Sequence, residues 1–243
     1  LFKGRRKELD ALVQDRDTNY AIVGARRIGK TSLLCRAHST LRANPDWRPR
    51  VYSFNCLVWG DFWDCWDRMA HALDVRREAR IEHGIRNISY LLDRVSARGN
   101  KPLLLLFDEV DRIIDIDRNN DWSFFRSLAE ATQNRWIRIA IAGYRSLARL
   151  MEDGDAPFYR AIELIEMTAL TKSETIAVVA DPFVNMDIKI EGESEFYERL
   201  WHVTRGYPFV VQLVGQELFQ YACSRSPRSV TPGDIDEIEK GNT

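Results

Sequence analysis

Four residues near the amino terminus have the types and spacing of a phosphate-binding site. They fit the pattern G-x-x-x-x-G-K-[ST] and are Gly24, Gly29, Lys30 and Thr31. Glycine lets a loop wrap closely around a polyphosphate, and the loop N–H groups and the positive end of a following helix then face the anion. We expect Lys30 to reach the β- and γ-phosphates of a nucleotide and the Thr31 hydroxyl to bind Mg²⁺.

The sequence around this loop provides the strand and the helix that the pattern needs. Residues 20–23 form a short apolar run that predicts a buried strand. The apolar residues after the loop recur at the spacing of one helical face and are Leu33, Leu34, Ala37 and Leu41. Arg26 and Arg27 either add charge near the phosphates or point into solvent, and we expect solvent for at least one. The predicted nucleotide contacts of the loop are Gly24, Arg27, Ile28, Gly29, Lys30, Thr31 and Ser32.

An acidic pair follows the most apolar run of the chain. Residues 103–107 are five consecutive apolar residues, which favour a central parallel strand covered on both faces, and Asp108 and Glu109 come directly after them. Ligands of open α/β sheets collect at the carboxyl ends of the strands. We therefore expect Asp108 to hold Mg²⁺, directly or through water, and Glu109 to orient or deprotonate the attacking water. The alternative is a solvated acidic turn.

Two arginines are further candidates for the reaction. Residues 138–143 predict a fourth strand, and Arg145 after it can contact the γ-phosphate and stabilise the charge that develops during transfer. The alternative for Arg145 is a surface position. Arg160, before a fifth strand over residues 162–167, is a less favoured candidate for an arginine finger supplied to a neighbouring subunit.

Other groups that resemble sites have simpler structural explanations. A second acidic group matches no calcium loop and predicts a solvated acidic loop: Asp111, Asp115 and Asp117. A helix capped by Asp61 carries residues that can stack on bases, but their helical spacing favours the core: Phe62, Trp63, Trp66 and Met69. The cysteines are scattered and predict reduced core thiols in a cytosolic protein: Cys35, Cys56, Cys65 and Cys223.

The organisation of the chain changes near residue 170. Before it, strands alternate with helices, with residues 51–55 as the remaining strand, and this predicts an α/β core over residues 1–170. From Thr171, which begins a capping box with Glu174, the pattern shows helices only and predicts a lid over residues 171–243. The length of 243 residues suits one large α/β domain with a helical appendage. The first residue is not methionine, so we expect a fragment of a longer protein.

The overall composition argues against two classes of protein. The net charge is −1, which is unlike a strongly basic nucleic-acid-binding domain but leaves room for a local patch. No apolar run approaches the length of a membrane span, and no signal peptide is visible. We therefore expect a cytoplasmic protein.

Five motifs in order resemble the AAA+/STAND ATPases, especially their archaeal-ATPase-like and bacterial STAND branch. They are Phe2-x-Gly4-Arg5-x-x-Glu8-Leu9, Gly24-x-Arg26-Arg27-x-Gly29-Lys30-Thr31-Ser32-Leu33-Leu34, Phe107-Asp108-Glu109, Ala142-Gly143-Tyr144-Arg145 and Arg205-Gly206-Tyr207-Pro208. The resemblance implies a three-layer α/β P-loop NTPase with a parallel sheet of strand order 5-1-4-3-2, followed by a small α-helical lid. It covers nearly the whole chain.

The resemblance also implies roles for particular residues. The segment with Phe2, Gly4 and Arg5 is expected along the adenine, and Arg145 is expected to be the sensor after the fourth strand. Tyr207 and Pro208 are expected to pack near the base from the lid. The family usually has two glycines before this proline dipeptide, whereas Arg205 replaces the first one here. That arginine either adds a nucleotide contact or is an exposed charge.

Three functions compete. The leading prediction is an ATP-dependent, Mg²⁺-dependent molecular switch, in which ATP or ADP sets the lid position and controls homo-oligomer assembly or a carboxyl-terminal effector outside the fragment. The second is a DNA-associated AAA+ ATPase of the initiator or transposition-regulator type. Its candidate DNA contacts are Arg76, Arg77, Arg80, Arg135 and Arg138. The third is a phosphotransferase, although an acidic pair suits water activation better than transfer to a hydroxyl.

Overall fold

The computed structural model describes residues 3–47, 50–74, 92–93, 103–158 and 161–241. These residues form two compact units. The described residues within 7–25 and 30–167 form the α/β unit, and those within 168–243, 1–6 and 26–29 form the helical unit. The amino-terminal segment and the centre of the predicted phosphate loop thus belong to the helical unit.

The α/β unit has five strands and six described α-helices, and one 3-10 turn follows the second strand. The strands are β1 (Tyr20–Gly24), β2 (Val51–Asn55), β3 (Leu103–Asp108), β4 (Ile137–Gly143) and β5 (Glu163–Met167). The helices are α1 (Arg6–Gln14), α2 (Lys30–Ala43), α3 (Phe62–Ala72), α6 (Asp111–Arg118), α7 (Ser123–Gln133) and α8 (Arg145–Glu152). The 3-10 turn is η2 (Cys56–Val58). The sequence patterns did not predict α8.

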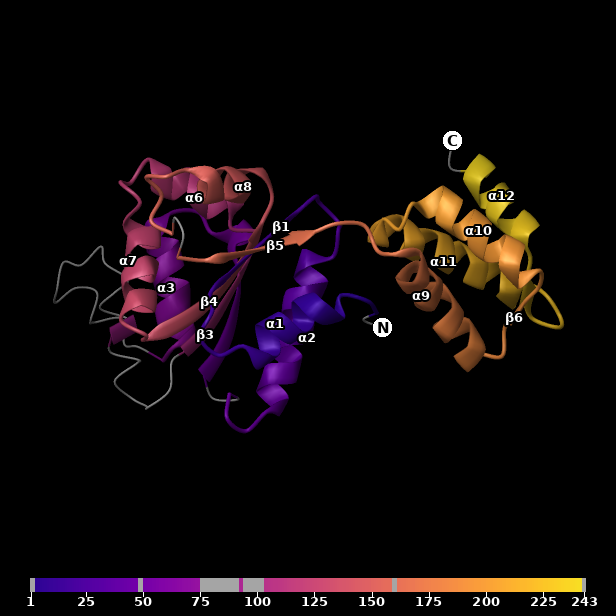
Figure 1. Cartoon of the computed structure of the whole chain (residues 1–243), viewed down its shortest axis with the longest axis horizontal. Helices are drawn as coiled ribbons and strands as arrows, with labels where there is room; N and C mark the ends of the chain where they lie inside the picture. The colour runs from indigo at the N-terminus through magenta and orange to yellow at the C-terminus, as the bar shows by residue number, and fades with distance from the viewer. Residues whose placement is uncertain (1–2, 48–49, 75–91, 94–102, 159–160, 242–243) are drawn as a thin grey trace. The chain divides into compact units, whose positions relative to one another are not determined.

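The five strands form one parallel sheet in the order β2-β3-β4-β1-β5. This confirms the predicted order 5-1-4-3-2, read from the other edge. In Figure 1, α1 and α2 lie on one side of the sheet and α3 and α7 on the other, which gives three layers. The register pairs Asn55 with Asp108 and Val23 with Gly143, so the carboxyl ends of neighbouring strands lie together.

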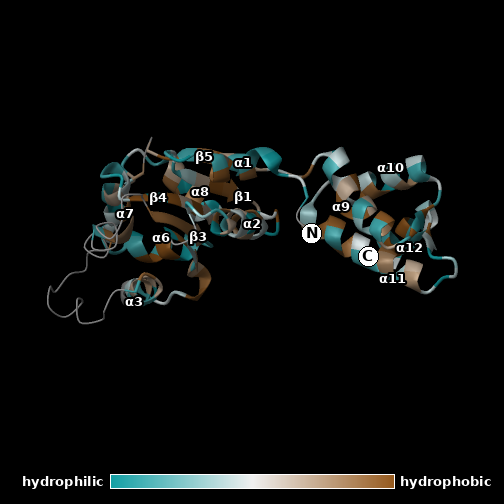
Figure 2. Ribbon diagram, turned by 90° about the horizontal axis from the view of Figure 1, so that it is seen from below, coloured by the Kyte–Doolittle hydropathy of each residue, from teal (hydrophilic) through white to brown (hydrophobic). Residues whose placement is uncertain are grey.

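The central strands are apolar because both of their faces are covered. Every residue of β3 and β4 is buried, and Figure 2 shows β1, β3 and β4 as the hydrophobic centre of this unit. Burial of each large aliphatic side chain contributes about 2 kcal/mol. The edge strand β5, by contrast, exposes most of its side chains.

Helix α3 contributes two of its four predicted core side chains to the core, and the side chains of the other two, Phe62 and Trp63, lie outside the described residues. Asp61 caps it by accepting a hydrogen bond from the Asp64 N–H at 2.8 Å. Trp66 and Met69 are buried in the main apolar cluster. These two side chains therefore support the fold and do not form a base-stacking platform.

The second acidic group is not the solvated loop that its spacing predicts. All three aspartates lie on α6, and the Asp117 carboxylate is buried at the start of α7. It accepts hydrogen bonds from the N–H groups of Phe124 and Phe125, both at 2.9 Å. Burial raises the pKa of Asp117, although these hydrogen bonds oppose the shift. Asp117 is therefore a helix cap supplied from a preceding helix.

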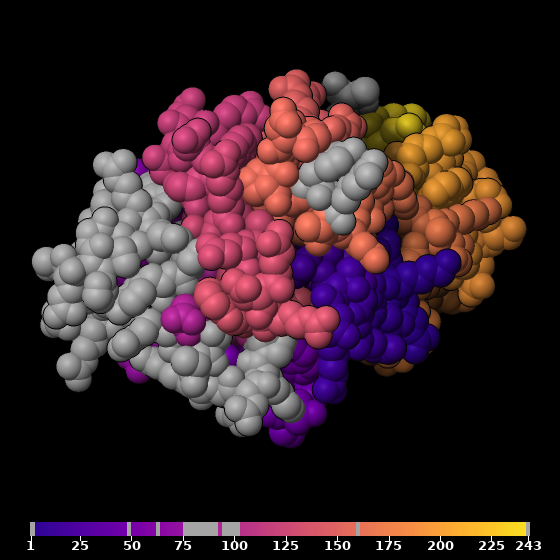
Figure 3. All heavy atoms as spheres, turned by 60° about the vertical axis from the view of Figure 1, so that its left-hand side comes forward, coloured from indigo at the N-terminus to yellow at the C-terminus, as the bar shows by residue number. Residues whose placement is uncertain are grey.

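Arg138 is also a structural residue, which corrects its assignment as a candidate DNA contact. Its side chain is 2% exposed and donates hydrogen bonds to the carbonyl oxygens of Thr18, Leu12 and Ala11 at 2.6, 3.1 and 3.3 Å. Two of these carbonyls belong to the last turns of α1, where main-chain oxygens lack helical partners. Arg138 thus connects β4 to the amino-terminal region, and Figure 3 shows this region in indigo beside the pink middle of the chain.

We expect Arg138→Ala to lower the free energy of unfolding of the protein by about 2 kcal/mol, because charge-assisted hydrogen bonds are lost and carbonyls are left buried. Urea denaturation followed by circular dichroism measures this change. Arg135→Ala is the matched control, because Arg135 is exposed at the turn before β4. Equal stability of the two variants would contradict the structural role of Arg138.

The helical unit contains four helices and one small strand pair among its described residues. The helices are α9 (Lys172–Asn185), α10 (Glu193–Thr204), α11 (Pro208–Cys223) and α12 (Pro232–Gly241). Strands β6 (Lys189–Ile190) and β7 (Ser229–Val230) pair in parallel, so the prediction of helices only was wrong. The apolar core of the unit includes Phe196, Leu200, Val211, Leu218 and Ile235. The capping box of Thr171 and Glu174 is present.

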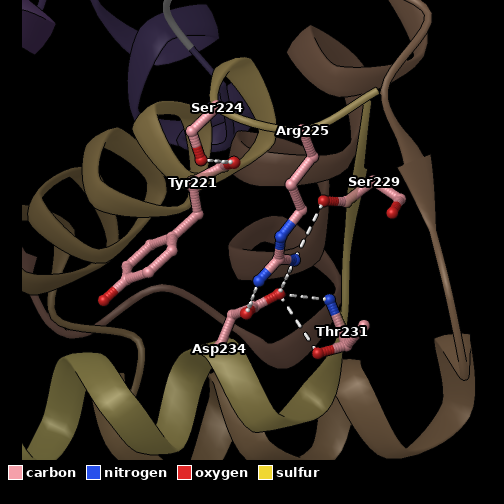
Figure 4. A network of polar contacts seen from close by, with 6 residues as sticks. All are labelled: Tyr221, Ser224, Arg225, Ser229, Thr231 and Asp234. Atoms are coloured by element: carbon pink, nitrogen blue, oxygen red, sulfur yellow. Dashed lines mark hydrogen bonds and ion pairs between the residues drawn. The ribbon is translucent and has the colours of Figure 1, made fainter. Parts of the chain in front are cut away.

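An ion pair ties the end of α11 to the start of α12 (Figure 4). The Arg225 guanidinium donates to both oxygens of Asp234, at 2.5 and 2.7 Å, and to the Ser229 carbonyl at 3.2 Å. Asp234 also accepts the N–H of Thr231 at 2.7 Å. The hydrogen bonds from Arg225 lower the pKa of Asp234. The network fixes the connection that carries β7.

The cysteines differ in their exposure to solvent. All four cysteines are free, but only Cys56 and Cys65 are buried, while Cys35 and Cys223 are exposed. The prediction that all are core thiols was therefore wrong for two of them. Within the described ranges, no helix is both long enough and apolar enough to cross a membrane.

Candidate functional site

Lys30 is the first residue of α2 and is buried at the end of β1. Its ammonium group donates hydrogen bonds to the carbonyl oxygens of Gly24 and Ala25, at 2.8 and 3.0 Å. Burial lowers the pKa of Lys30, while the carboxylates of Glu109, Asp108 and Asp111 act to raise it. Lys30 and the acidic residues at and just beyond the end of β3 are therefore close enough to interact electrostatically.

This environment fits an anionic ligand. An ammonium group has three donors, and neutral carbonyls accept two of them here. In the part of the chain that the structure describes, no carboxylate forms a direct ion pair with Lys30. A buried charge is costly unless it is paired, so a phosphate group would complete the coordination of this side chain.

The acidic pair occupies the end of β3. Asp108 is 7% exposed, and its Oδ1 accepts a hydrogen bond from the Glu109 N–H at 3.0 Å. Glu109 is half-buried and has a φ of 56°, a left-handed conformation that costs a non-glycine residue on the order of 1 kcal/mol. Such strain concentrates at sites where the direction of a side chain matters.

The oxygen atoms of this region suit Mg²⁺, which binds proteins through few side chains and relies on phosphate and water for its remaining ligands. Thr31 and Ser32 are exposed in the first turn of α2, and Asp108 provides a carboxylate in the same unit. Among the described residues, no cluster of three or more acidic, histidine or cysteine side chains could hold a metal ion alone. The hydroxyl and carboxylate oxygens of Thr31 and Asp108 are donors of the kind that would hold Mg²⁺ together with a nucleotide.

Arg145 begins α8, one residue beyond the turn residue Tyr144 that follows β4, and is exposed. Its guanidinium carbon lies 5.2 Å from the centre of the Tyr144 ring, and the Lys30 Nζ lies 6.0 Å from the same centre. The aromatic face of Tyr144 is thus shared by two cations of the candidate site. In the sequence, only the position of Tyr144 between Gly143 and Arg145 could have indicated this role.

Asp111 is a second residue that the sequence did not place at this site. Its carboxylate accepts the N–H groups of Tyr144 and Ser146, at 2.6 and 2.7 Å, and that of Leu147 at 3.4 Å. It therefore caps α8 and holds the turn that carries Arg145. Its prediction as part of a solvated acidic loop was wrong, because α6 turns the side chain toward β4.

The amino-terminal segment lies within the helical unit. Gly4 has a φ of 72°, and a Cβ there would lie 2.8 Å from Oε1 of Glu174. The same oxygen accepts the N–H of Arg5 at 3.0 Å, and the buried Arg5 guanidinium donates to the Thr168 carbonyl. The position of Phe2 lies outside the described residues. The predicted roles of Gly4 and Arg5 toward adenine stay predictions.

Loop residues 26–29 lie within the same unit. Arg27 and Gly29 have φ values of 61° and 104°. Left-handed residues of this kind occur in the main-chain concavities that bind anions. Arg26 and Arg27 are exposed, whereas Ile28 is buried. The Tyr207 hydroxyl donates to the Arg26 carbonyl, and the Arg27 guanidinium lies 4.2 Å from the Phe209 ring centre.

The dipeptide at the start of α11 is shaped by the two residues before it. Arg205 ends α10 with a φ of 48° and is exposed, so the position occupies the left-handed conformation that glycine favours. Gly206 has a φ of 69°, and a Cβ there would lie 2.2 Å from the Leu170 carbonyl oxygen. Tyr207 then caps α11 and Pro208 is its first residue.

The structure thus places the predicted residues in two groups. Lys30, Thr31, Ser32, Asp108, Glu109 and Arg145 lie in the α/β unit, together with Gly24. Gly4, Arg5, Arg27, Ile28, Gly29, Tyr207 and Pro208 lie in the helical unit. Arg160 and the proposed DNA contacts Arg76, Arg77 and Arg80 lie outside the described residues.

Solved structures share this fold at low sequence identity. The Walker-type ATPase PABY2304 of Pyrococcus abyssi has a TM-score of 0.63 and 15% identity, over 99% of this chain and 73% of that chain. The RuvB Holliday junction branch migration motor of Thermotoga maritima has a TM-score of 0.58 and 14% identity, over 97% and 68%. The ORC1 protein of Aeropyrum pernix in complex with DNA has a TM-score of 0.61 and 12% identity, over 99% and 66%.

The sequence itself matches a known protein family over more than half of its length. A search of curated proteins finds no significant match. The sequence profile described as "AAA domain" matches residues 13–151, which is more than half of the chain. This range contains the lysine, the acidic pair and the arginine described above. The chain therefore belongs to the AAA domain family of P-loop ATPases.

Proposed function

We propose that this chain binds ATP with Mg²⁺, hydrolyses it slowly and works as a nucleotide-dependent switch of the STAND type. The observation that carries the proposal is the buried Lys30 ammonium, which two neutral carbonyls hold and which the carboxylates after β3 influence. Membership of the AAA domain family supports nucleotide binding at this lysine.

Five residues of the α/β unit bind ATP or act in its hydrolysis in this proposal. Lys30 binds the β- and γ-phosphates, while Thr31 and Asp108 would hold Mg²⁺. Glu109 orients or deprotonates the attacking water, because its carboxylate projects from a strained turn at the end of β3. Arg145 stabilises the negative charge that develops on the transferred phosphoryl group. Bound Mg²⁺ supplies further neutralisation of that charge.

The helical unit provides the switch in this proposal. Residues 171–243 work as a lid on a core of residues 1–170, and Gly4, Arg5, Tyr207 and Pro208 contact the nucleotide base. The observation in favour is that residues 26–29 of the loop belong to the same compact unit as α9–α12. A nucleotide that contacts the loop would bind more tightly in one lid position than in another. This difference in affinity is what a ligand-driven switch requires. Self-assembly or an effector outside this chain would provide the output.

A DNA-associated ATPase is the second candidate. The observation that favours it is that similar structures include a Holliday junction motor and an ORC1 protein in complex with DNA. Against it, Arg138 is buried and unavailable to DNA.

ATP turnover with and without duplex DNA tests both functions. The switch predicts slow hydrolysis that DNA leaves unchanged and that rises with protein concentration as copies assemble. The DNA-associated function predicts stimulation by DNA, together with binding that weakens as salt rises. Rapid hydrolysis by a strictly monomeric protein would contradict the switch, and absence of any ATP binding would contradict both.

A further inference from the structure

The turn between β4 and α8 is held by a side chain from another helix. Asp111 Oδ2 accepts the Tyr144 N–H at 2.6 Å, and Oδ1 accepts the Ser146 N–H at 2.7 Å and the Leu147 N–H at 3.4 Å. One carboxylate therefore accepts three main-chain donors on both sides of Arg145. Its negative charge also lies at the positive end of α8.

The same segment is joined to β4 through the main chain. The Val110 N–H donates to the Ala142 carbonyl at 3.0 Å, one residue before Gly143. A Cβ at Gly143 would lie 2.7 Å from Asp111 Oδ2 and 2.8 Å from the Leu147 Cβ. There is thus no room at Gly143 for a side chain while Asp111 keeps its place. The chain after Glu109 and the chain before Arg145 form one fixed junction.

We propose that Asp111 is a positioning residue, which fixes the β4–α8 turn so that Tyr144 and Arg145 hold their places at the candidate phosphate site. The inference rests on the proposed ATPase function. The junction links the end of β3, which carries Asp108 and Glu109, to the turn that carries Arg145. Asp111 itself contacts main-chain N–H groups and takes no part in the chemical step.

Two contacts make the position of this turn important. The centre of the Tyr144 ring lies 5.2 Å from the Arg145 guanidinium carbon and 6.0 Å from the Lys30 ammonium nitrogen. A shift of the turn therefore moves Arg145 and removes the aromatic face beside Lys30. Small displacements of a group that acts in the transition state reduce the rate strongly, while ground-state binding of the nucleotide depends mainly on Lys30 and the loop.

Asp111→Asn tests the proposal because it keeps the size of the side chain. An asparagine side chain has one acceptor oxygen, whereas both carboxylate oxygens of Asp111 accept N–H groups. Its NH₂ group would therefore face an N–H donor, and the hydrogen bonds of one of the two oxygens are lost. We expect kcat for ATP hydrolysis to fall at least tenfold and the Kd for ATP to change less than threefold. Hydrogen exchange of the Tyr144 and Ser146 amides should become faster.

Gly143→Ala disturbs the same junction from the opposite side and should reproduce the loss of kcat. Asp115→Asn is the matched control, since Asp115 lies one turn further along α6 and its carboxylate accepts a hydrogen bond from the Ser146 hydroxyl, at 3.1 Å, and not from the main chain of the turn among the described residues. We expect its kcat to equal that of the original protein. In the double variant Asp111→Asn/Arg145→Ala, the loss should be no larger than for Arg145→Ala alone, because both changes remove one arrangement.

The outcomes separate this inference from the proposed function. If the original protein hydrolyses ATP while Asp111→Asn and Gly143→Ala lower only the melting temperature and leave kcat unchanged, Asp111 is merely structural and the inference fails. Additive losses in the double variant would overturn it as well. If the original protein neither binds nor hydrolyses ATP, the proposed function itself fails.

Discussion

Lys30→Ala should weaken ATP binding about 1,000-fold, because the variant loses the remaining ammonium donor to phosphate and the attraction of the positive charge for the β- and γ-phosphates, together about 4 kcal/mol. The fold should persist, because the hydrogen bonds of the ammonium to the Gly24 and Ala25 carbonyls are offset by the cost of burying its charge. Burial lowers the pKa of Lys30 for the same reason. Competition with a fluorescent nucleotide measures the change in Kd.

The control for this variant is another lysine of the chain. Lys189 lies on β6 with its side chain 75% exposed and 4.0 Å from Glu191. Lys189→Ala should bind ATP as the original protein does. If Lys30→Ala and Lys189→Ala bind ATP equally well, the phosphate site does not include Lys30.

Glu109→Gln should retain ATP binding and lose turnover about 1,000-fold, since a glutamine amide cannot accept a proton from water. The substitution keeps the size of the side chain at a position whose φ of 56° already constrains the turn. Single-turnover hydrolysis measures the loss, and calorimetry with ATP shows that binding remains.

The matched control changes a glutamate away from the strand end. Glu152 is the exposed last residue of α8, and Glu152→Gln should hydrolyse ATP at the original rate. Turnover by Glu109→Gln at that same rate would exclude Glu109 as the residue that activates water. A parallel loss of binding would instead place Glu109 among the residues that hold the nucleotide.

The fold could be predicted where local sequence patterns determine it. The run of five apolar residues in β3 requires cover on both faces, and the structure buries all of them. The helix caps at Asp61 and Thr171 could be predicted because each accepts a hydrogen bond from a residue three positions later in the sequence. The strand order came from the family resemblance, because no local pattern specifies which strands are neighbours.

The remaining features depend on contacts between distant residues. Asp111 reaches the N–H groups of residues more than thirty positions away. Its spacing from Asp115 and Asp117 contains no sign of these contacts and indicated a solvated acidic loop instead. Arg138 has carbonyl partners about 120 residues earlier, and an arginine in a strand otherwise resembles a surface charge. The strands β6 and β7 contain two residues each, too few to show any period.

Calorimetric titration of the folded protein with ATP in the presence of Mg²⁺ tests the central claim most directly. The claim is that the buried Lys30 and the acidic pair at the end of β3 form one nucleotide site. It predicts heat with one ATP bound per chain, and a weaker signal when Mg²⁺ is removed by a chelator. No heat on adding either ATP or ADP to folded protein would contradict it.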